Sequence, residues 1–210
     1  MWRKLYSLIN CQSLDVTESI WVKCFMAVDA TGIMKLDLQQ DYFSLFDIAS
    51  GFQINTTLLE QNYRALQAQV HPDKFSHLSE TERRLSMQWA TRVNEAYQTL
   101  RSPLNRARYL LSLHGVETLE ETNTAMPMDF LMQQMEWRES LADAKLKNNS
   151  IMVEKIEQQV QNTKQTLERE LAHQLDNVHD YNAASGIVRK LKFIEKLAEE
   201  IGSAFDELDK

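Results

Sequence analysis

The heptapeptide Gln69-Val70-His71-Pro72-Asp73-Lys74-Phe75 decides the fold of this chain of 210 residues, because it stands between two amphipathic segments. Asn55 or Thr56 can cap a helix that runs to about Val70. Proline disfavours helical geometry in the residue before it, so the chain leaves that helix at His71-Pro72-Asp73. The segment Ser79-Glu80-Thr81-Glu82 has the spacing of a capping box and begins the next helix. The pattern predicts two helices joined by a stiff loop.

Helical signals continue on both sides of this loop. Apolar residues recur at spacings of three or four up to about Leu100. Ser102-Pro103 has the composition of a helix start, and His114-Gly115 that of a helix end with a left-handed glycine cap. On the other side, the apolar stretch at residues 41–46 predicts a short helix. We therefore expect residues 39–115 to form one helical domain.

The second half of the chain predicts a three-helix bundle. Residues 116–127 are polar and acidic and are interpreted as a linker. Three long helices are expected at about 128–147, 150–176 and 180–208, and short turns between them make neighbours antiparallel. In the last of these helices, one apolar seam is predicted to pack inward: Ala184, Ile187, Leu191, Ile194, Ala198, Ile201, Phe205 and Leu208. The chain has only 5 Gly and 3 Pro, which argues against an all-β fold, because its many tight turns need those residues. The expected fold class is therefore all-α.

Charge and composition exclude several classes of protein. The whole net charge of −7 lies in residues 119–210, where there are 18 acidic and 11 basic residues, and no part of the chain has the net positive charge that nucleic-acid binding requires. No apolar run is long enough for a membrane helix. Cys11 and Cys24 cannot form a disulfide framework or a cysteine-rich metal site. We expect neither a metal nor a cofactor. We expect a cytoplasmic protein.

The first 38 residues are interpreted as an extension that is disordered or accessory. Asn10-Cys11-Gln12-Ser13 interrupts the apolar centre that a secretory signal needs. Acidic residues in the same stretch argue against a mitochondrial presequence. A second translation start at Met26 or Met34 is the alternative.

Two further segments give the loop its context. About twenty residues after it come Val93-Asn94-Glu95-Ala96-Tyr97-Gln98-Thr99-Leu100-Arg101-Ser102-Pro103 and then Arg106-Ala107-Arg108-Tyr109. Residues 41–115 thereby resemble a J-domain, the module that engages the ATPase domain of heat-shock chaperones. The resemblance implies that His71, Pro72 and Asp73 stimulate ATP hydrolysis in that partner without chemistry of their own. We expect Lys74 and Arg64 to join this contact.

One departure from the J-domain pattern concerns charge. The helix at 56–70 contains Arg64 as its sole basic residue, although J-domains usually present a basic helix here. Electrostatic steering toward the chaperone is therefore weak, or it relies on Lys74, Arg83 and Arg84.

The helix at 128–147 has two apolar stripes when each residue is turned by about 100°. One stripe is assigned to the core: Phe130, Trp137, Leu141 and Ala144. The other centres on roughly the opposite side: Met128, Leu131, Met132 and Met135. Carboxylates flank the second stripe, at Glu136, Glu139 and Asp143. An apolar strip rimmed with negative charge indicates a partner surface, and the alternative is that the J-domain or the extension covers it.

Three segments carry a second resemblance: Tyr109-Leu110-Leu111-Ser112-Leu113-His114-Gly115, Phe130-Leu131-Met132-Gln133-Gln134-Met135-Glu136-Trp137-Arg138-Glu139 and Val188-Arg189-Lys190-Leu191-Lys192-Phe193. With them, about 170 residues resemble the HscB family, co-chaperones that deliver the iron–sulfur scaffold IscU to the chaperone HscA. Eukaryotic members carry an N-terminal cysteine-rich module, which Cys11 and Cys24 alone do not make, so the bacterial form fits better. The resemblance places scaffold contacts at Leu131, Met132, Met135, Glu136, Glu139, Asp143 and Phe193.

These contact positions contain two departures and one open assignment. Met135 and Asp143 stand where the family usually has Leu and Glu. Phe193 lies about 125° from the apolar seam of its helix, so it is either exposed or at the edge of the core.

Two other classes of function are weighed against this one. An enzyme is disfavoured because the histidine pairs His71/His77 and His173/His179 are six residues apart, and no phosphate loop or nucleophile elbow is present. The alternative is a general J-protein that delivers unfolded clients. Such a protein would need a broad apolar groove, whereas the strip here is narrow and rimmed with charge.

Overall fold

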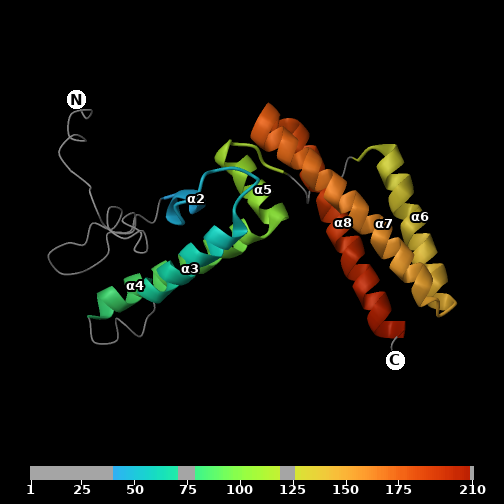
Figure 1. Cartoon of the computed structure of the whole chain (residues 1–210), viewed down its shortest axis with the longest axis horizontal. Coiled ribbons are helices and arrows are strands. Elements are labelled where there is room, and N and C mark those ends of the chain that lie inside the picture. The colour runs from blue at the N-terminus through green and yellow to red at the C-terminus, as the bar shows by residue number, and fades with distance from the viewer. Residues whose placement is uncertain (1–39, 71–78, 119–125, 209–210) are drawn as a thin grey trace, which may run out of the picture. The chain divides into compact units, whose positions relative to one another are not determined.

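The computed structural model describes residues 40–70, 79–118 and 126–208, and every regular element in these ranges is helical (Figure 1). The elements are α2 (Tyr42–Leu45), α3 (Thr56–Val70), α4 (Glu80–Arg101), α5 (Pro103–Leu113), α6 (Met128–Leu146), α7 (Ser150–Ala172), η2 (His173–Val178) and α8 (Tyr181–Leu208). The all-α class is confirmed. The expectations for the extension at 1–38 and for the loop at 71–74 lie outside the described residues, and the domain boundaries stay predictions.

Asp41 begins the first element as a side-chain cap. Its carboxylate accepts hydrogen bonds from the backbone N–H groups of Phe43 and Ser44, at 3.0 Å each. Burial by itself raises the pKa of the Asp41 carboxyl. The hydrogen bonds from the Ser44 hydroxyl and from the two N–H groups outweigh it and hold that pKa below its ordinary value. The Tyr42 ring, next along, stacks on Tyr109 of α5 with centroids 4.3 Å apart.

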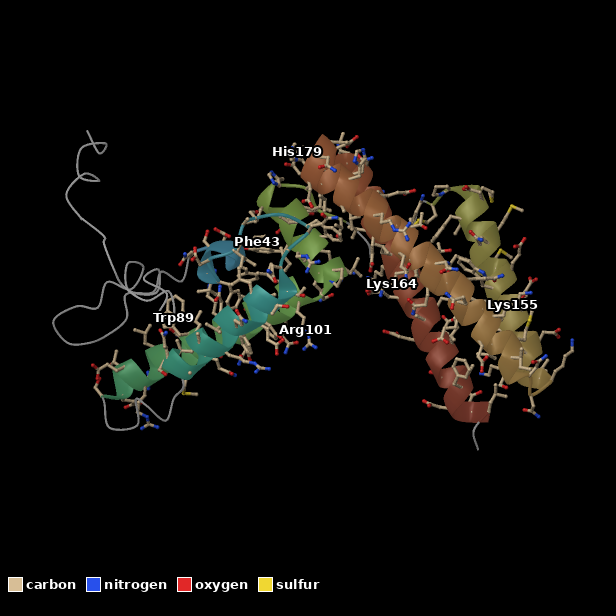
Figure 2. All side chains as sticks on the ribbon, in the orientation of Figure 1. Phe43, Trp89, Arg101, Lys155, Lys164 and His179 are labelled. Atoms are coloured by element: carbon tan, nitrogen blue, oxygen red, sulfur yellow. The ribbon has the colours of Figure 1, made fainter. Side chains whose placement is uncertain are left out.

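The helices α3 and α4 pack side by side (Figure 1). Trp89 of α4 is buried, as the apolar spacing predicts (Figure 2). The Ser86 hydroxyl donates to the C=O of Val70 at 3.0 Å, which satisfies a carbonyl at the end of α3. The capping box predicted at Ser79 and Glu82 is present. The loop therefore joins the end of one packed helix to the capped start of the other.

Arg106 is a buried cation on α5. Its Nη1 donates to the C=O of Leu100 at 2.6 Å, and its guanidinium lies 5.2 Å from the ring centroid of Phe52. Burial lowers the pKa of the Arg106 guanidinium, and the carboxylates of Asp176 and Glu168 oppose that shift. This arginine therefore connects α5 to the end of α4 and to Phe52.

Helices α6, α7 and α8 pack against one another, as predicted for the bundle. The buried face of α8 is wider than the predicted seam. Val188, Leu197 and Ala204 are buried as well, whereas three seam positions are half-buried: Ala198, Phe205 and Leu208. Helix α8 contacts α5 and η2 as well as α6 and α7, so more than one of its faces is covered. In the described ranges, no helix has the length and apolar character that crossing a membrane requires.

Asp176 connects the segment at Phe52 and Gln53, between α2 and α3, to the C-terminal helices. The α-helix predicted to reach residue 176 instead widens after Ala172 into the π-helical segment η2. From there the Asp176 carboxylate accepts the backbone N–H groups of Phe52 and Gln53, at 2.6 and 2.9 Å. From Asp41 onward the chain forms one compact unit.

Candidate functional site

Helix α6 presents its methionines to solvent. Met128, Met132 and Met135 are 71%, 56% and 61% exposed, and Leu131 beside them is half-buried. We call these four residues the methionine face. The opposite stripe is buried as predicted: Phe130, Trp137, Leu141 and Ala144. The exposure excludes the alternative in which the J-domain region covers the strip, and residues 1–38, the other candidate cover, lie outside the described residues.

The predicted rim of negative charge is exposed. Within the described ranges, Glu136 and Glu139 form no ion pair, so their carboxylates face solvent alone. Asp143 differs, because its Oδ2 accepts from Nζ of Lys147 at 2.5 Å in a pair one helical turn apart. Of the three rim carboxylates, the two without an ion pair in the described ranges are thus the ones beside Met132 and Met135.

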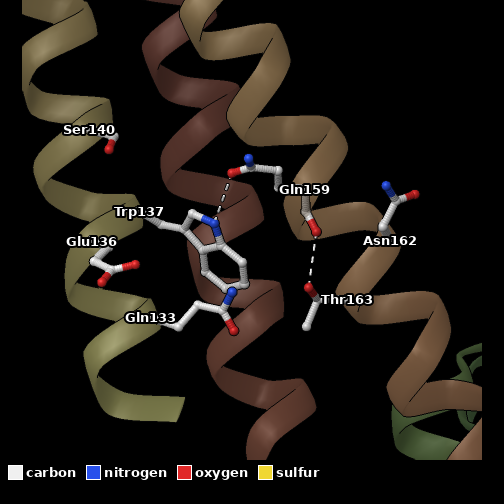
Figure 3. A pocket seen from close by; sticks show the side chains of 7 residues that line it. All are labelled: Gln133, Glu136, Trp137, Ser140, Gln159, Asn162 and Thr163. Atoms are coloured by element: carbon white, nitrogen blue, oxygen red, sulfur yellow. Dashed lines mark hydrogen bonds between the residues drawn. The ribbon is translucent and has the colours of Figure 1, made fainter. Parts of the chain in front are cut away.

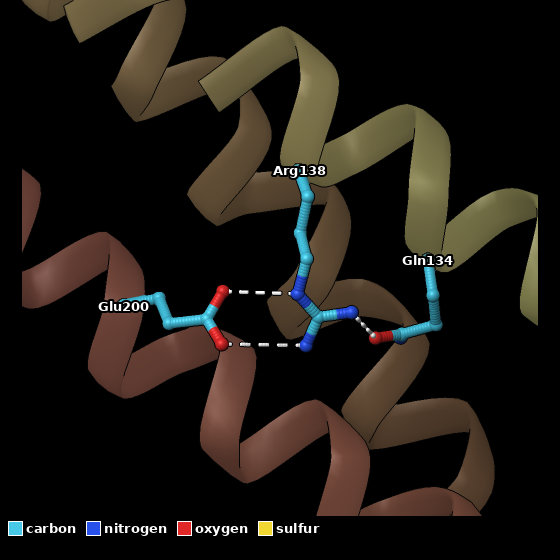
Figure 4. A network of polar contacts seen from close by, with 3 residues as sticks. All are labelled: Gln134, Arg138 and Glu200. Carbon is cyan, nitrogen blue, oxygen red and sulfur yellow. Dashed lines mark hydrogen bonds and ion pairs between the residues drawn. The ribbon is translucent and has the colours of Figure 1, made fainter. Parts of the chain in front are cut away.

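An ion pair fixes α6 against α8 on one side of the methionine face. Nε of Arg138 lies 3.0 Å from Oε2 of Glu200, and its Nη2 donates to Oε1 at 3.4 Å (Figure 4). Nη1 of the same guanidinium donates to Oε1 of Gln134 at 3.3 Å (Figure 4). Phe193 of α8 is half-buried, which places it at the edge of the core rather than fully exposed.

A polar groove of about 400 Å³ borders the other side, between α6 and α7. Its floor is fixed by Trp137, whose indole Nε1–H donates to Oε1 of Gln159 at 3.2 Å (Figure 3). The lining consists of amides, hydroxyls, this indole and one carboxylate, that of Glu136 (Figure 3). Glu136 therefore stands between the methionine face and the groove.

The predicted chaperone contacts are described only in part. Arg64 lies on α3 with its side chain 74% exposed, and its Nη2 pairs with Oε1 of Glu60 at 2.5 Å. His71, Pro72, Asp73 and Lys74 lie outside the described residues. The packed and capped ends of α3 and α4 are the structural setting of that loop.

Sequence reasoning did not find the polar residues that hold this framework. Gln134 and Arg106 are only 3% and 6% exposed, although glutamine and arginine are residue types that usually lie on the surface. Asp176 carries no local signal, because its partners are more than 120 residues away. Arg106 and Gln134 each stand in a segment that carries a family resemblance, whereas Asp176 does not.

Comparison with known proteins decides the family. The model of the HSCB C-terminal oligomerisation domain matches residues 126–202, which contain the whole methionine face. A co-chaperone protein HscB homolog of Azoarcus sp. (strain BH72) is 48% identical over 176 residues, which are 84% of this chain and 99% of the relative. The chain belongs to the HscB co-chaperone family. The HscB homolog of Aromatoleum aromaticum is 46% identical over the same shares of the two chains.

Solved structures of HscB proteins have the same fold. Chaperone HscB from Vibrio cholerae superposes with a TM-score of 0.73 at 37% identity, over 80% of this chain and 99% of that one. Human co-chaperone protein HscB gives a TM-score of 0.79 at 31% identity, over 94% and 95% of the two chains. The HscB resemblance inferred from the sequence is confirmed, and the relatives are named as chaperones or co-chaperones rather than as enzymes.

Proposed function

We propose that this HscB-family protein is a co-chaperone of iron–sulfur cluster assembly. Its J-domain loop stimulates the ATPase of an HscA-type heat-shock chaperone, and its bundle binds and delivers an IscU-type scaffold. The observation that carries the proposal is the exposed methionine face with its carboxylate rim in a chain of this family. The protein's own residues bind and orient partners, and the chemistry belongs to the chaperone and its nucleotide.

The scaffold side of the proposal rests on burial and charge. Large apolar side chains that are more than half exposed gain free energy when a partner covers them, and methionine adapts to the partner's shape. Glu136 and Glu139 are ready to accept basic side chains of the scaffold. Asp143 can exchange Lys147 for such a partner, because an exposed pair contributes at most about 1 kcal/mol. Phe193 supplies an aromatic edge from α8.

The chaperone side rests on the loop between α3 and α4. Pro72 stiffens the loop, so that His71 and Asp73 lose little conformational entropy on binding. Lys74 and Arg64 add positive charge for an acidic chaperone surface. Because Glu60 already pairs with Arg64, α3 contributes little net positive charge and steers the chaperone weakly, unless Lys74, Arg83 and Arg84 supply that charge.

Replacing His71, Pro72 and Asp73 together with Ala tests the two halves separately. We expect the variant to lose stimulation of the HscA-type ATPase, measured as steady-state phosphate release, because no stiff loop is left to bias the chaperone. Scaffold affinity measured by calorimetry should stay unchanged, since the loop is not part of the methionine face. Gln88→Ala, at an exposed position of α4, is the matched control and should stimulate normally. Full stimulation by the triple variant contradicts the role given to the loop.

The same preparations distinguish a scaffold from unfolded clients. Folded IscU-type scaffold should bind to the bundle, whereas a reduced, denatured polypeptide should not compete with it. If only the denatured chain bound, the protein would be a general J-protein and the proposal would be wrong.

A further inference from the structure

Leu146 is the most exposed apolar residue of α6. Its side chain is 84% exposed, more than any of the three methionines of the methionine face. It is not one of the seven proposed scaffold contacts. One exposed leucine needs no special reason, but its position relative to the methionines is informative.

The geometry of α6 puts Leu146 on the same line as the methionines. It follows Met128 by eighteen residues, which is about five turns of a helix with 3.6 residues per turn. At about 100° per residue, Met132 and Met135 deviate from that line by about 40° and 20°. Exposed apolar side chains therefore recur along the whole helix, over about 27 Å, with Glu139 and Ala142 on the same side between Met135 and Leu146.

The charge changes along this line. Beside Met132 and Met135 the carboxylates of Glu136 and Glu139 stand without a cation in the described ranges. Beside Leu146, Asp143 is paired with Lys147 at 2.5 Å, and Lys145 is paired with Glu207 of α8 at 2.6 Å. The Leu146 end is thus apolar and locally neutral, whereas the middle is negative.

The charge also indicates which occupant fits. A second copy of this chain packed symmetrically about the middle of the line would bring Glu136 and Glu139 against the same carboxylates, and like charges in such an interface oppose association. A partner with basic residues opposite the middle and an apolar patch opposite the end would match both parts.

We infer that the scaffold-binding surface extends beyond the family's seven positions to Leu146, which contacts an apolar patch of the same IscU-type partner. This inference rests on the proposed function. Ile151, 76% exposed in the first turn of α7, adds apolar surface at the same end of the bundle.

Calorimetric titration of purified IscU-type scaffold into the full-length chain tests the inference. Leu146→Ser should raise the dissociation constant at least about fivefold, as truncation of a contributing interface residue does. Val178→Ser is the matched control, because Val178 is 52% exposed at the far end of the α7–η2 segment, and it should change the constant less than about twofold. Thermal unfolding midpoints should match the wild type in both variants, since neither side chain is buried.

Met132→Ser separates the inference from the proposed function. If Met132→Ser weakens binding and Leu146→Ser does not, the surface ends before Leu146 and only the inference is wrong. If neither variant weakens binding, both are wrong. Sedimentation velocity adds one further outcome. The inference is overturned if three results occur together: the wild type self-associates, the Leu146→Ser variant is monomeric, and the variant's affinity for the scaffold is unchanged. In that case Leu146 contacts a second copy of this chain.

Discussion

Asp41 shows how one carboxylate defines the start of a short helix. The sequence predicts an apolar helix over residues 41–46, and the structure has α2 at Tyr42–Leu45 with Asp41 as its cap. The capping contacts come from Phe43 and Ser44, including the Ser44 hydroxyl at 2.6 Å. A free-standing helix of four residues is not stable, so this cap, the Tyr42–Tyr109 stack and the burial of Phe43 and Phe46 hold it in place.

The cap predicts a pH-dependent effect of Asp41→Ala. At pH 7 the substitution should lower the free energy of unfolding by about 1 kcal/mol, the usual contribution of an N-cap. The folded-state pKa is lowered below the ordinary 3.8, so the charge-dependent part is present above pH 3.8 and is lost as the pH falls through the folded value. Urea unfolding of both proteins at pH 7 and pH 3 measures this. An equal difference at both pH values contradicts the assignment.

Polar residues in the core mark the limit of sequence reasoning at this scale. In the core, Gln134 Oε1 accepts a hydrogen bond from Arg138 and Arg106 Nη1 donates one to the C=O of Leu100, whereas Gln134 Nε2 and Arg106 Nε have no hydrogen-bond partner in the described structure. Residue type predicts the opposite placement for both, since glutamine and arginine are usually exposed. Only the three-dimensional position of a partner could have revealed them.

Helix α6 could be predicted almost entirely from its sequence. Its two stripes follow from the turn per residue, because the core side is formed by large apolar residues and the other side by methionines flanked by carboxylates. Exposure of the methionines, unlike their function, follows from this pattern alone.

The two faces of α6 should respond differently to truncation. Leu141→Ala should lower the free energy of unfolding by about 2–5 kcal/mol, because Leu141 is 5% exposed and its loss leaves a cavity. Met135→Ala, at a 61% exposed position, should change it by less than about 0.5 kcal/mol. Urea midpoints of the two variants make the comparison. Similar losses for both would show that the methionine face is packed rather than free.

Helix α8 could be predicted less completely. The sequence predicts one apolar seam, as expected for a helix that packs against one neighbour. In the structure, α8 packs against α5, α6, α7 and η2. The number of neighbours is a property of the tertiary fold, and so Val188 and Leu197 were not predicted as core residues. The π-helical end of α7 was missed for a related reason, because no residue type in 173–178 signals a wider turn.

At the scale of the molecule, contacts of long sequence separation join the J-domain region to the bundle. Asp176 holds the backbone of Phe52 and Gln53, and the His114 ring stacks on Tyr181 with centroids 4.0 Å apart. Neither contact follows a local pattern, so the sequence predicts two regions but not how they are joined. The regions that we propose for chaperone and scaffold nevertheless use separate elements, α3–α4 and α6–α8.

The most direct test of the central claim is a calorimetric titration of IscU-type scaffold into the full-length chain and into a variant with Leu131, Met135 and Phe193 all replaced by Ala. The claim predicts that the wild type binds and that the variant's dissociation constant rises at least about tenfold, because each anchor contributes about 1–3 kcal/mol. Circular dichroism should show that the variant remains folded. An unchanged dissociation constant would contradict the claim that the methionine face holds the scaffold.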